Sequence, residues 1–300
     1  QLSFISLVED INKRNRINLM NQVYYTIALA AVYFSREADL TLVMALLYLK
    51  EIAMVAVITW RFRFRILFRG ISWKFVFQIL RFGLFPMLSV LLITFNYNID
   101  IIILKLYVSY EQIGFYSVGV SLANQVWLIP DAFKDVIFKM TAERDSVKEI
   151  TLSIKINLYI SILIIAFLVL FGEFVITLLF GESYLPSYSV TIVTVAGVLP
   201  MIFFKMIQPL FNAAGKQKLS FSILLVSALA NVVLNFIFIP KYGILGAALT
   251  SIFSYSVSGL LFALFFMRDY QVRLGNFFLL NREERLVLKK LLVRGRNPDT

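Results

Sequence analysis

Residues 219–267 of the 300-residue chain read LSFSILLVSALANVVLNFIFIPKYGILGAALTSIFSYSVSGLLFALFFM. A helix that crosses a bilayer needs about 20 mostly apolar residues, and this stretch holds two such runs, Leu219–Ile239 and Ile244–Met267. Its only charged residue, Lys241, lies in the break Pro240–Gly243, where Pro and Gly favour a turn. The stretch therefore predicts two antiparallel transmembrane helices joined by a tight turn.

The whole chain has the composition of a membrane protein. Hydrophobic residues make up 60% of it, charged residues only 16%, and the mean hydropathy is +0.81. Soluble domains contain about 25% charged residues, so this chain has too few to cover a water-facing surface. It has no His and no Cys, which excludes Ser-His-Asp and Cys-His catalysis, zinc clusters, haem ligation by these residues and disulfides. We therefore predict an all-α, polytopic transmembrane helical bundle.

Six further segments have the length and apolar content of a spanning helix. With the pair above they give about eight spans: Ile17–Phe34, Leu40–Trp60, Phe82–Lys105, Gly114–Met140, Ile154–Phe180, Ser187–Phe211, Leu219–Ile239 and Ile244–Met267. The first two spans would end an N-terminal bundle (residues 1–60), and the other six would form a C-terminal bundle (residues 82–267). Residues 1–16 resemble the end of an earlier helix, so we expect the N-terminal bundle to be truncated.

The cations are unevenly distributed about these spans, which accounts for the formal net charge of +11. If successive loops alternate between the two membrane faces, 23 of the 29 Lys and Arg fall on one face, three on the other and three within spans. Lys and Arg accumulate in cytoplasmic loops, so the cation-rich face is predicted to be cytoplasmic. A nucleic-acid partner, the other common reason for a basic composition, is not expected.

Two basic segments are amphipathic rather than spanning. Residues 61–81 (RFRFRILFRGISWKFVFQILR) mix six cations with Trp and Phe, a pattern typical of a linker lying at the cytoplasmic membrane surface. Residues 268–300 are predicted to form a basic amphipathic cytoplasmic tail. For both segments, we interpret the pattern as anchoring to the lipid surface; the alternative interpretation is binding of nucleic acid or of a regulatory protein.

Ionisable residues inside spans are costly to bury and are therefore candidates for function. In the third span, Asn96 and Asp100 fall on one helical face. One hypothesis is that Asp100 faces a cavity and serves in cation or proton coupling, or binds sugar. The alternative is a structural interhelical bond or an interfacial carboxylate near the external end.

The fourth span carries a polar stripe made of Asn124, Asp131, Lys134 and Asp135. Pro130 would kink the helix beside it, and Lys134 can pair with either carboxylate. The stripe either lines a cavity or marks the cytoplasmic end of a short helix.

The sixth span carries a third stripe, Lys205, Gln208 and Asn212. A lysine ammonium suits phosphate, so Lys205 facing a cavity would neutralise a phosphate group of a substrate. The alternative is that Lys205 snorkels toward the cytoplasmic headgroups.

Two other patterns are interpreted as packing. Ser227, Asn231 and Asn235 form an amide and hydroxyl ladder that would bond a neighbouring helix, and Gly246, Thr250, Ser254 and Ser258 form a small-residue face for close helix approach.

Several of these features occur in an order and spacing that resemble a known family. Gly83 and Pro86 enter a span, Asp100 is its single intramembrane acid, and residues 114–118 (GFYSV) open the next span. Near the C-terminus the pattern continues with Asn235, Pro240, Gly243, Gly246, Ala247 and Ala248. Together they resemble the second half of Wzx-like polysaccharide-transporter flippases, in the multidrug/oligosaccharidyl-lipid/polysaccharide exporter superfamily.

The resemblance covers nearly the whole chain and implies a transporter without a cofactor. Such flippases arrange about twelve or more spans as two six-helix bundles around a central cavity. They move lipid-linked repeat units of O-antigen or capsule across the bacterial inner membrane by alternating access, which places this chain in lipopolysaccharide or polysaccharide biosynthesis. The implied partners are a polyprenyl-diphosphate-linked oligosaccharide, membrane lipids and a glycan polymerase or other assembly protein.

Two alternatives stay open: a multidrug or small-solute cation-coupled antiporter of the same superfamily, and a non-transporting membrane scaffold. An enzyme is not expected, because no polar stripe supplies a catalytic set and the predicted external loops are short.

Overall fold

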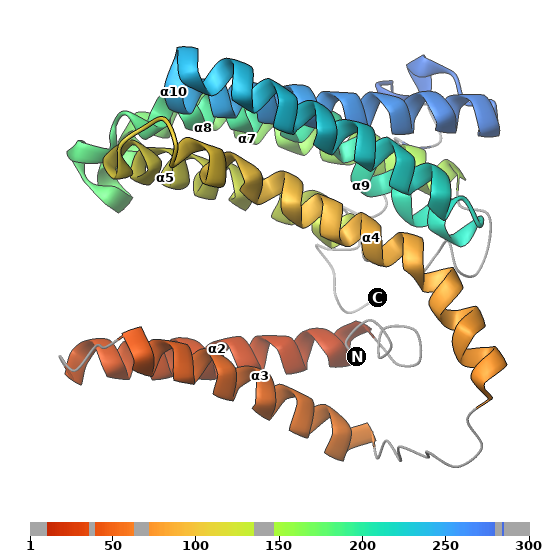
Figure 1. Cartoon of the computed structure of the whole chain (residues 1–300), viewed down its shortest axis with the longest axis horizontal. Coiled ribbons are helices and arrows are strands. Elements are labelled where there is room, and N and C mark those ends of the chain that lie inside the picture. Colours follow the sequence, from red (N-terminus) through yellow and green to blue (C-terminus); the bar gives the residue numbers. More distant parts are fainter. Residues whose placement is uncertain (1–10, 36–39, 63–71, 135–146, 280–283, 285–300) are drawn as a thin grey trace. The chain divides into compact units, whose positions relative to one another are not determined.

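The computed structural model describes residues 11–35, 40–62, 72–134, 147–279 and 284. These residues form helices and turns, with no strand among them, which confirms the all-α prediction. The chain divides into two compact units, Gln1–Val76 and Phe77–Thr300. Figure 1 shows the helices of each unit. The boundary falls within the predicted linker, of which residues 63–71 lie outside the described part.

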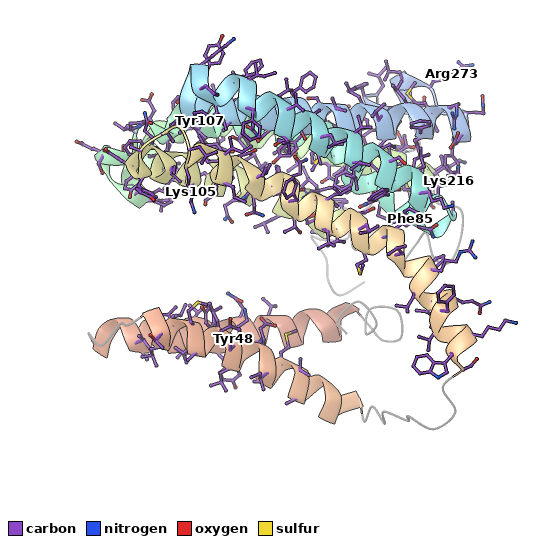
Figure 2. All side chains as sticks on the ribbon, viewed as in Figure 1. Tyr48, Phe85, Lys105, Tyr107, Lys216 and Arg273 are labelled. Atoms are coloured by element: carbon purple, nitrogen blue, oxygen red, sulfur yellow. The ribbon has the colours of Figure 1, made fainter. Side chains whose placement is uncertain are left out.

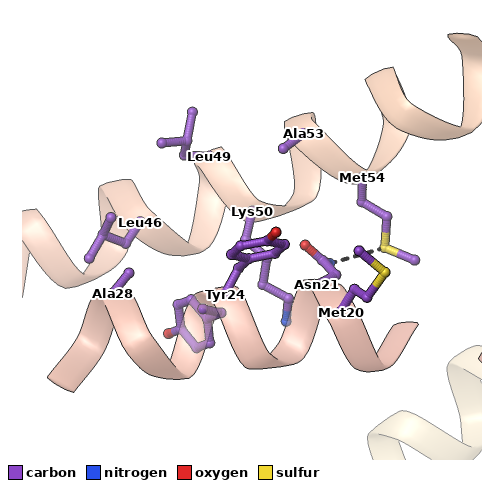
Figure 3. Close-up of a pocket in the computed structure, with 10 residues that line it drawn as sticks. Met20, Asn21, Tyr24, Ala28, Leu46, Leu49, Lys50, Ala53 and Met54 are labelled. Carbon is purple, nitrogen blue, oxygen red and sulfur yellow. Dashed lines mark hydrogen bonds between the residues drawn. The ribbon is translucent and has the colours of Figure 1, made fainter. Parts of the chain in front are cut away.

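The first unit contains the helix pair α2 (Ile11–Ser35) and α3 (Leu40–Phe62). Lys50 of α3 donates to the Gln22 side chain over 3.3 Å and lies 4.9 Å from the Tyr25 ring centroid, both on α2. A cavity of about 330 Å³ lies between the two helices, and Figure 3 shows Lys50 and Tyr24 among the residues that line it.

The second unit begins within α4 (Trp73–Leu104), which is followed by α5 (Tyr110–Val126). The Ser109 hydroxyl caps α5 by accepting from the Gln112 N–H. We predicted one span over Gly114–Met140, kinked beside Pro130, but α5 begins earlier and ends at Val126; Trp127 forms a turn, after which residues 128–134 are helical again. Pro130 explains the break, because proline has no N–H and its ring clashes with the carbonyl four residues earlier.

The predicted span Ser187–Phe211 is also broken. It follows α7 (Val147–Phe180) and the short turn η1 (Glu182–Tyr184), and consists of α8 (Ser187–Ala196) and α9 (Val198–Ala213), bent by 42°. Gly197 joins the two helices, and Pro200 lies in the first turn of α9, where its missing N–H is tolerated. Each of these two breaks therefore lies three residues before a proline.

The stretch quoted at the outset forms α10 (Gln217–Tyr270), which folds back on itself at Gly243 (Figure 1). Gly243 has φ 55° and ψ −132°, a conformation open essentially to glycine alone, so the predicted turn is confirmed. The small-residue face Gly246, Thr250, Ser254 and Ser258 is buried, as expected for close packing. The turn η2 (Leu274–Phe277) follows α10.

Three helical segments of the described residues are long and apolar enough to cross a membrane: Val76–Leu104, Val147–Phe180 and Gln217–Tyr270. The bent pair α8 and α9 would be a fourth, and the shorter apolar segment Leu19–Val32 lies in α2. Because α10 has 54 residues and a crossing needs about 20, its two arms suffice for two crossings. The protein is a multi-pass helical membrane protein.

The core of the second unit surrounds α9, whose residues Met201–Ile207 are all buried. Phe211, Phe262, Phe266 and Phe277 are fully enclosed around it. Figure 2 shows Lys105 and Tyr107 at one end of this unit and Lys216 and Arg273 at the other. Its helices therefore run between two polar ends, with α9 in the middle.

Candidate functional site

Asp100 lies at the centre of a buried hydrogen-bond network among α4, α5 and both arms of α10. Its carboxylate, 2% exposed, accepts from the Tyr116 hydroxyl at 2.8 Å and the Ser251 hydroxyl at 2.5 Å. The Asn235 amide donates to its other oxygen over 2.7 Å. No ion pair found among the described residues includes Asp100, so its carboxyl group is hydrogen-bonded by neutral donors alone.

The network extends along α10. Asn235 also donates to the Asn231 carbonyl oxygen over 2.6 Å and accepts from the Thr250 hydroxyl. About one turn along the bundle, Asn96 of α4 bonds Ser254 over 2.9 Å, and Ser254 bonds Ser227. Ser227 and Asn235 thus make the interhelical bonds predicted for the ladder, whereas Asn231 bonds Asn235 within its own helix arm, and Asn96 and Asp100 attach α4 to the same ladder.

This arrangement limits the chemistry available at Asp100. One carboxylate is surrounded by two hydroxyl donors and one amide N–H donor, and the described residues hold no group of three or more acidic, His or Cys side chains that could bind a metal ion. A single carboxylate suits a proton or a monovalent cation better than a divalent ion, which prefers several carboxylates.

A second cluster joins residues from two of the predicted stripes. The Lys205 ammonium on α9 lies 2.8 Å from one carboxylate oxygen of Asp131, and the Lys134 ammonium lies 3.4 Å from the other. The Lys205 side chain is only 5% exposed, whereas those of Asp131 and Lys134 are 43% and 39% exposed. Lys205 is therefore a buried cation that points to a half-open carboxylate, and does not snorkel.

An aromatic group surrounds the buried side of this cluster. The Lys205 ammonium lies 4.8 Å from the Trp127 ring centroid, within the range of a cation–π interaction. Trp127 packs against Tyr97 and Tyr255, with ring centroids 4.9 and 5.2 Å apart. The Trp127 indole N–H is buried and has no hydrogen-bond partner among the described residues.

The other predicted site residues belong to neither cluster. Asn124 lies exposed on α5, and Gln208 and Asn212 are half-buried on the turns of α9 that follow Lys205. Asp135 lies outside the described residues.

Several members of the two clusters were not predicted from the sequence: Tyr97, Tyr116, Trp127, Ser251 and Tyr255. The only local signal was the i, i+4 spacing of Trp127 and Asp131 on one helical face.

Comparison with known proteins places these features in a family context. A family model described as polysaccharide biosynthesis protein matches residues 9–189, well over half of the chain. An uncharacterized membrane protein of Methanocaldococcus jannaschii is 30% identical over 106 residues, which is 34% of this chain and 21% of that protein. The capsular polysaccharide biosynthesis protein CapF of Staphylococcus aureus is 28% identical over 115 residues, 38% of this chain and 29% of CapF.

The fold is shared with a solved structure, a transporter of the MOP superfamily from Pyrococcus furiosus. The TM-score is 0.50 at 19% identity, over 69% of this chain and 48% of the transporter. Similarity at this level shows the fold alone. The matched region spans about a fifth to a third of the two curated relatives and about half of the transporter.

Proposed function

This chain belongs to the polysaccharide biosynthesis protein family, and from that premise we propose that it is part of a flippase. The flippase would move lipid-linked oligosaccharide repeat units across the bacterial inner membrane by alternating access, with the cation-rich loops in the cytoplasm. Its membrane fold, shared with a MOP superfamily transporter, supports transport over catalysis.

The observation that carries this proposal is the pairing of the buried Lys205 with the half-exposed Asp131. A charge inside a membrane bundle is expensive and usually marks a substrate or ion pathway. Lys205 and Lys134 give the cluster two ammonium groups for one carboxylate. An ammonium is a compact point charge that suits phosphate, so the diphosphate of a polyprenyl-linked sugar is the ligand that fits best.

The helix breaks beside the cluster support the same function. Lys205 lies on α9 about two turns beyond the break at Gly197, and Asp131 follows the break at Trp127. Discontinuous helices at the binding site are common in secondary transporters, where bundles rock about that site. The sugar and diphosphate would lie at the cluster while the prenyl chain stays in lipid.

The second candidate, a cation-coupled antiporter for small solutes, draws on the network around Asp100. This carboxylate is held by neutral donors only, so no cationic side chain among the described residues would compete with a proton or a monovalent cation there. We propose that Asp100 is the coupling group in either case, so the two functions differ in cargo rather than in this site.

The function can be tested by measuring export of repeat units in a strain that lacks the gene for this chain, complemented with the full-length protein. We expect Lys205→Ala and Asp100→Asn to abolish export, because they remove the phosphate contact and the coupling group. Lys241→Ala, an exposed position at the α10 turn, is the matched control and should export normally.

Normal export with both Lys205→Ala and Asp100→Asn, at equal protein levels, would contradict the proposed site. Normal glycan export in the deletion strain, together with greater sensitivity to small cationic solutes, would favour the antiporter instead.

A further inference from the structure

We propose that Asp131 is a displaceable internal counter-ion that occupies, between Lys205 and Lys134, the position that a substrate phosphate takes during transport. The inference deepens the proposed function and rests on it, because it concerns the same cation cluster. It assigns Asp131 a role opposite to that of the lysines: Asp131 competes with the substrate and is released by it.

The charges of the cluster support this exchange. The Asp131 carboxylate bridges the two ammonium groups, at 2.8 Å from Lys205 and 3.4 Å from Lys134. Among the residues that the structure describes, two cations face one anion, an excess of one positive charge. The diphosphate of a lipid-linked sugar is esterified at both ends, so each of its two phosphates carries about one negative charge, and the two together would balance both ammonium groups better than one carboxylate does.

One half of the cluster is closely packed and suited to hold a ligand. Lys205 is buried, and Trp127 beneath it is held by the rings of Tyr97 and Tyr255. The Trp127 N–H is buried without an acceptor, although buried donors are nearly always paired. An oxyanion bound beside Lys205 would supply the missing acceptor.

The other half of the cluster can exchange. The Asp131 and Lys134 side chains are both about two-fifths exposed, and an ion pair of this exposure adds little to stability. Both residues follow the break at Trp127, so their displacement does not require α5 to unwind. When Asp131 leaves, the Trp127 ring continues to stabilise the Lys205 ammonium.

The test is a titration with inorganic pyrophosphate. Trp60→Phe and Trp73→Phe leave Trp127 as the only tryptophan, so its fluorescence in the detergent-purified chain reports binding at the cluster. We expect Asp131→Asn to bind pyrophosphate about tenfold more tightly than the parent, a change equivalent to one charge-assisted interaction.

Two variants control for charge and location. Glu173→Gln makes the same change in net charge at an exposed position on α7 and should leave the affinity unchanged. Lys205→Gln, added to Asp131→Asn, should abolish the gain. Equal or weaker binding by Asp131→Asn, or an equal gain in Glu173→Gln, would overturn the inference.

Lys134→Gln keeps the inference testable if Asp131→Asn does not fold. Because Lys134 is half-exposed, we expect the substitution to leave folding intact. Loss of the Lys134 ammonium should weaken pyrophosphate binding by about tenfold, and unchanged binding would overturn the inference.

The two proposals fail separately. Export that requires Lys205, together with no affinity gain in Asp131→Asn, would overturn the counter-ion but not the flippase. A tenfold gain together with export that is independent of Lys205 would overturn the flippase and support the counter-ion.

Discussion

Two ionisable side chains buried in the same bundle are stabilised in different ways. Asp100 is surrounded by neutral donors from three helices, whereas Lys205 is paired with a carboxylate and an aromatic ring. Because a buried charge without partners is very costly, each arrangement explains how its residue can lie inside the bundle. They differ in openness: the network of Asp100 is enclosed, and the partner of Lys205 is half-exposed.

At this scale we predict that Asp100→Ala destabilises the protein. The substitution leaves the buried donors of Tyr116, Ser251 and Asn235 without an acceptor. Summed over three bonds, the expected loss in free energy of unfolding is about 2–4 kcal/mol. Denaturation of the purified protein in mixed micelles, followed by circular dichroism, measures it.

Asn98→Ala is the control, because Asn98 is exposed on the same helix and bonds only the carbonyl of Thr94 within it. Its effect should stay within about 0.5 kcal/mol. Equal unfolding midpoints for the two variants would show that the Asp100 network contributes nothing.

Among the elements, α9 and α10 make the closest contact in the described structure. A Cβ atom at Gly259 of α10 would lie 2.0 Å from the backbone oxygen of Pro200 on α9. This closeness depends on glycine and brings α10 against the helix that carries Lys205. Small residues permit such backbone approach between membrane helices.

Gly259→Ala is therefore predicted to lower the free energy of unfolding by about 1–3 kcal/mol, because the obstructing atoms are backbone and the helices must move apart. The same denaturation measurement applies. Gly83→Ala on α4, where a Cβ would meet no atom within 4 Å, should be neutral or slightly stabilising, because alanine favours helix. A loss as large at Gly83 as at Gly259 would refute the packing argument.

At the scale of the whole molecule, the second unit has an apolar surface between two polar ends. Large apolar side chains are exposed along α4, α7 and α10, as expected for contact with lipid. At one end, Lys216 pairs with Asp269 over 2.9 Å, and the buried Lys155 pairs with Glu284 over 2.6 Å. The second of these pairs fixes a residue of the C-terminal tail against α7.

We predict that the two ends of this unit lie on opposite sides of the membrane. The chain has no cysteine, so single cysteines can be introduced at Tyr107 and Arg273, which lie at opposite ends (Figure 2). A membrane-impermeant maleimide applied to spheroplasts should label Tyr107→Cys directly. Arg273→Cys should react only after permeabilisation, because the cation-rich end is expected in the cytoplasm.

Leu170→Cys, exposed in the middle of α7, should stay unlabelled under both conditions, since the reagent does not enter lipid. Labelling of Tyr107→Cys and Arg273→Cys from the same side would refute the predicted topology.

Much of the fold could be predicted from local sequence patterns. Apolar runs of about 20 residues predict spanning helices, and the Pro240–Gly243 turn and the small-residue face of α10 follow from residue types that act locally. The interruption beside Pro130 was predicted as a kink, but the break at Gly197 was missed, although Pro200 was visible, because a proline inside an apolar run either kinks a helix or ends it. Which of these occurs depends on the surrounding packing.

The candidate site was predicted residue by residue but not as an assembly. Asn96, Asp100, Asp131, Lys134 and Lys205 could each be selected by the cost of polarity in a membrane, which is a property of the single residue. The contacts of the site join helices that are far apart in the sequence. These contacts are Asp131 with Lys205, Trp127 with Lys205, and Asp100 with Asn235 and Ser251. Local sequence patterns therefore predict the lipid environment, the helices and the candidate charges. The partners of those charges follow from the tertiary structure, because they are set by how helices pack and not by periodicity along one helix.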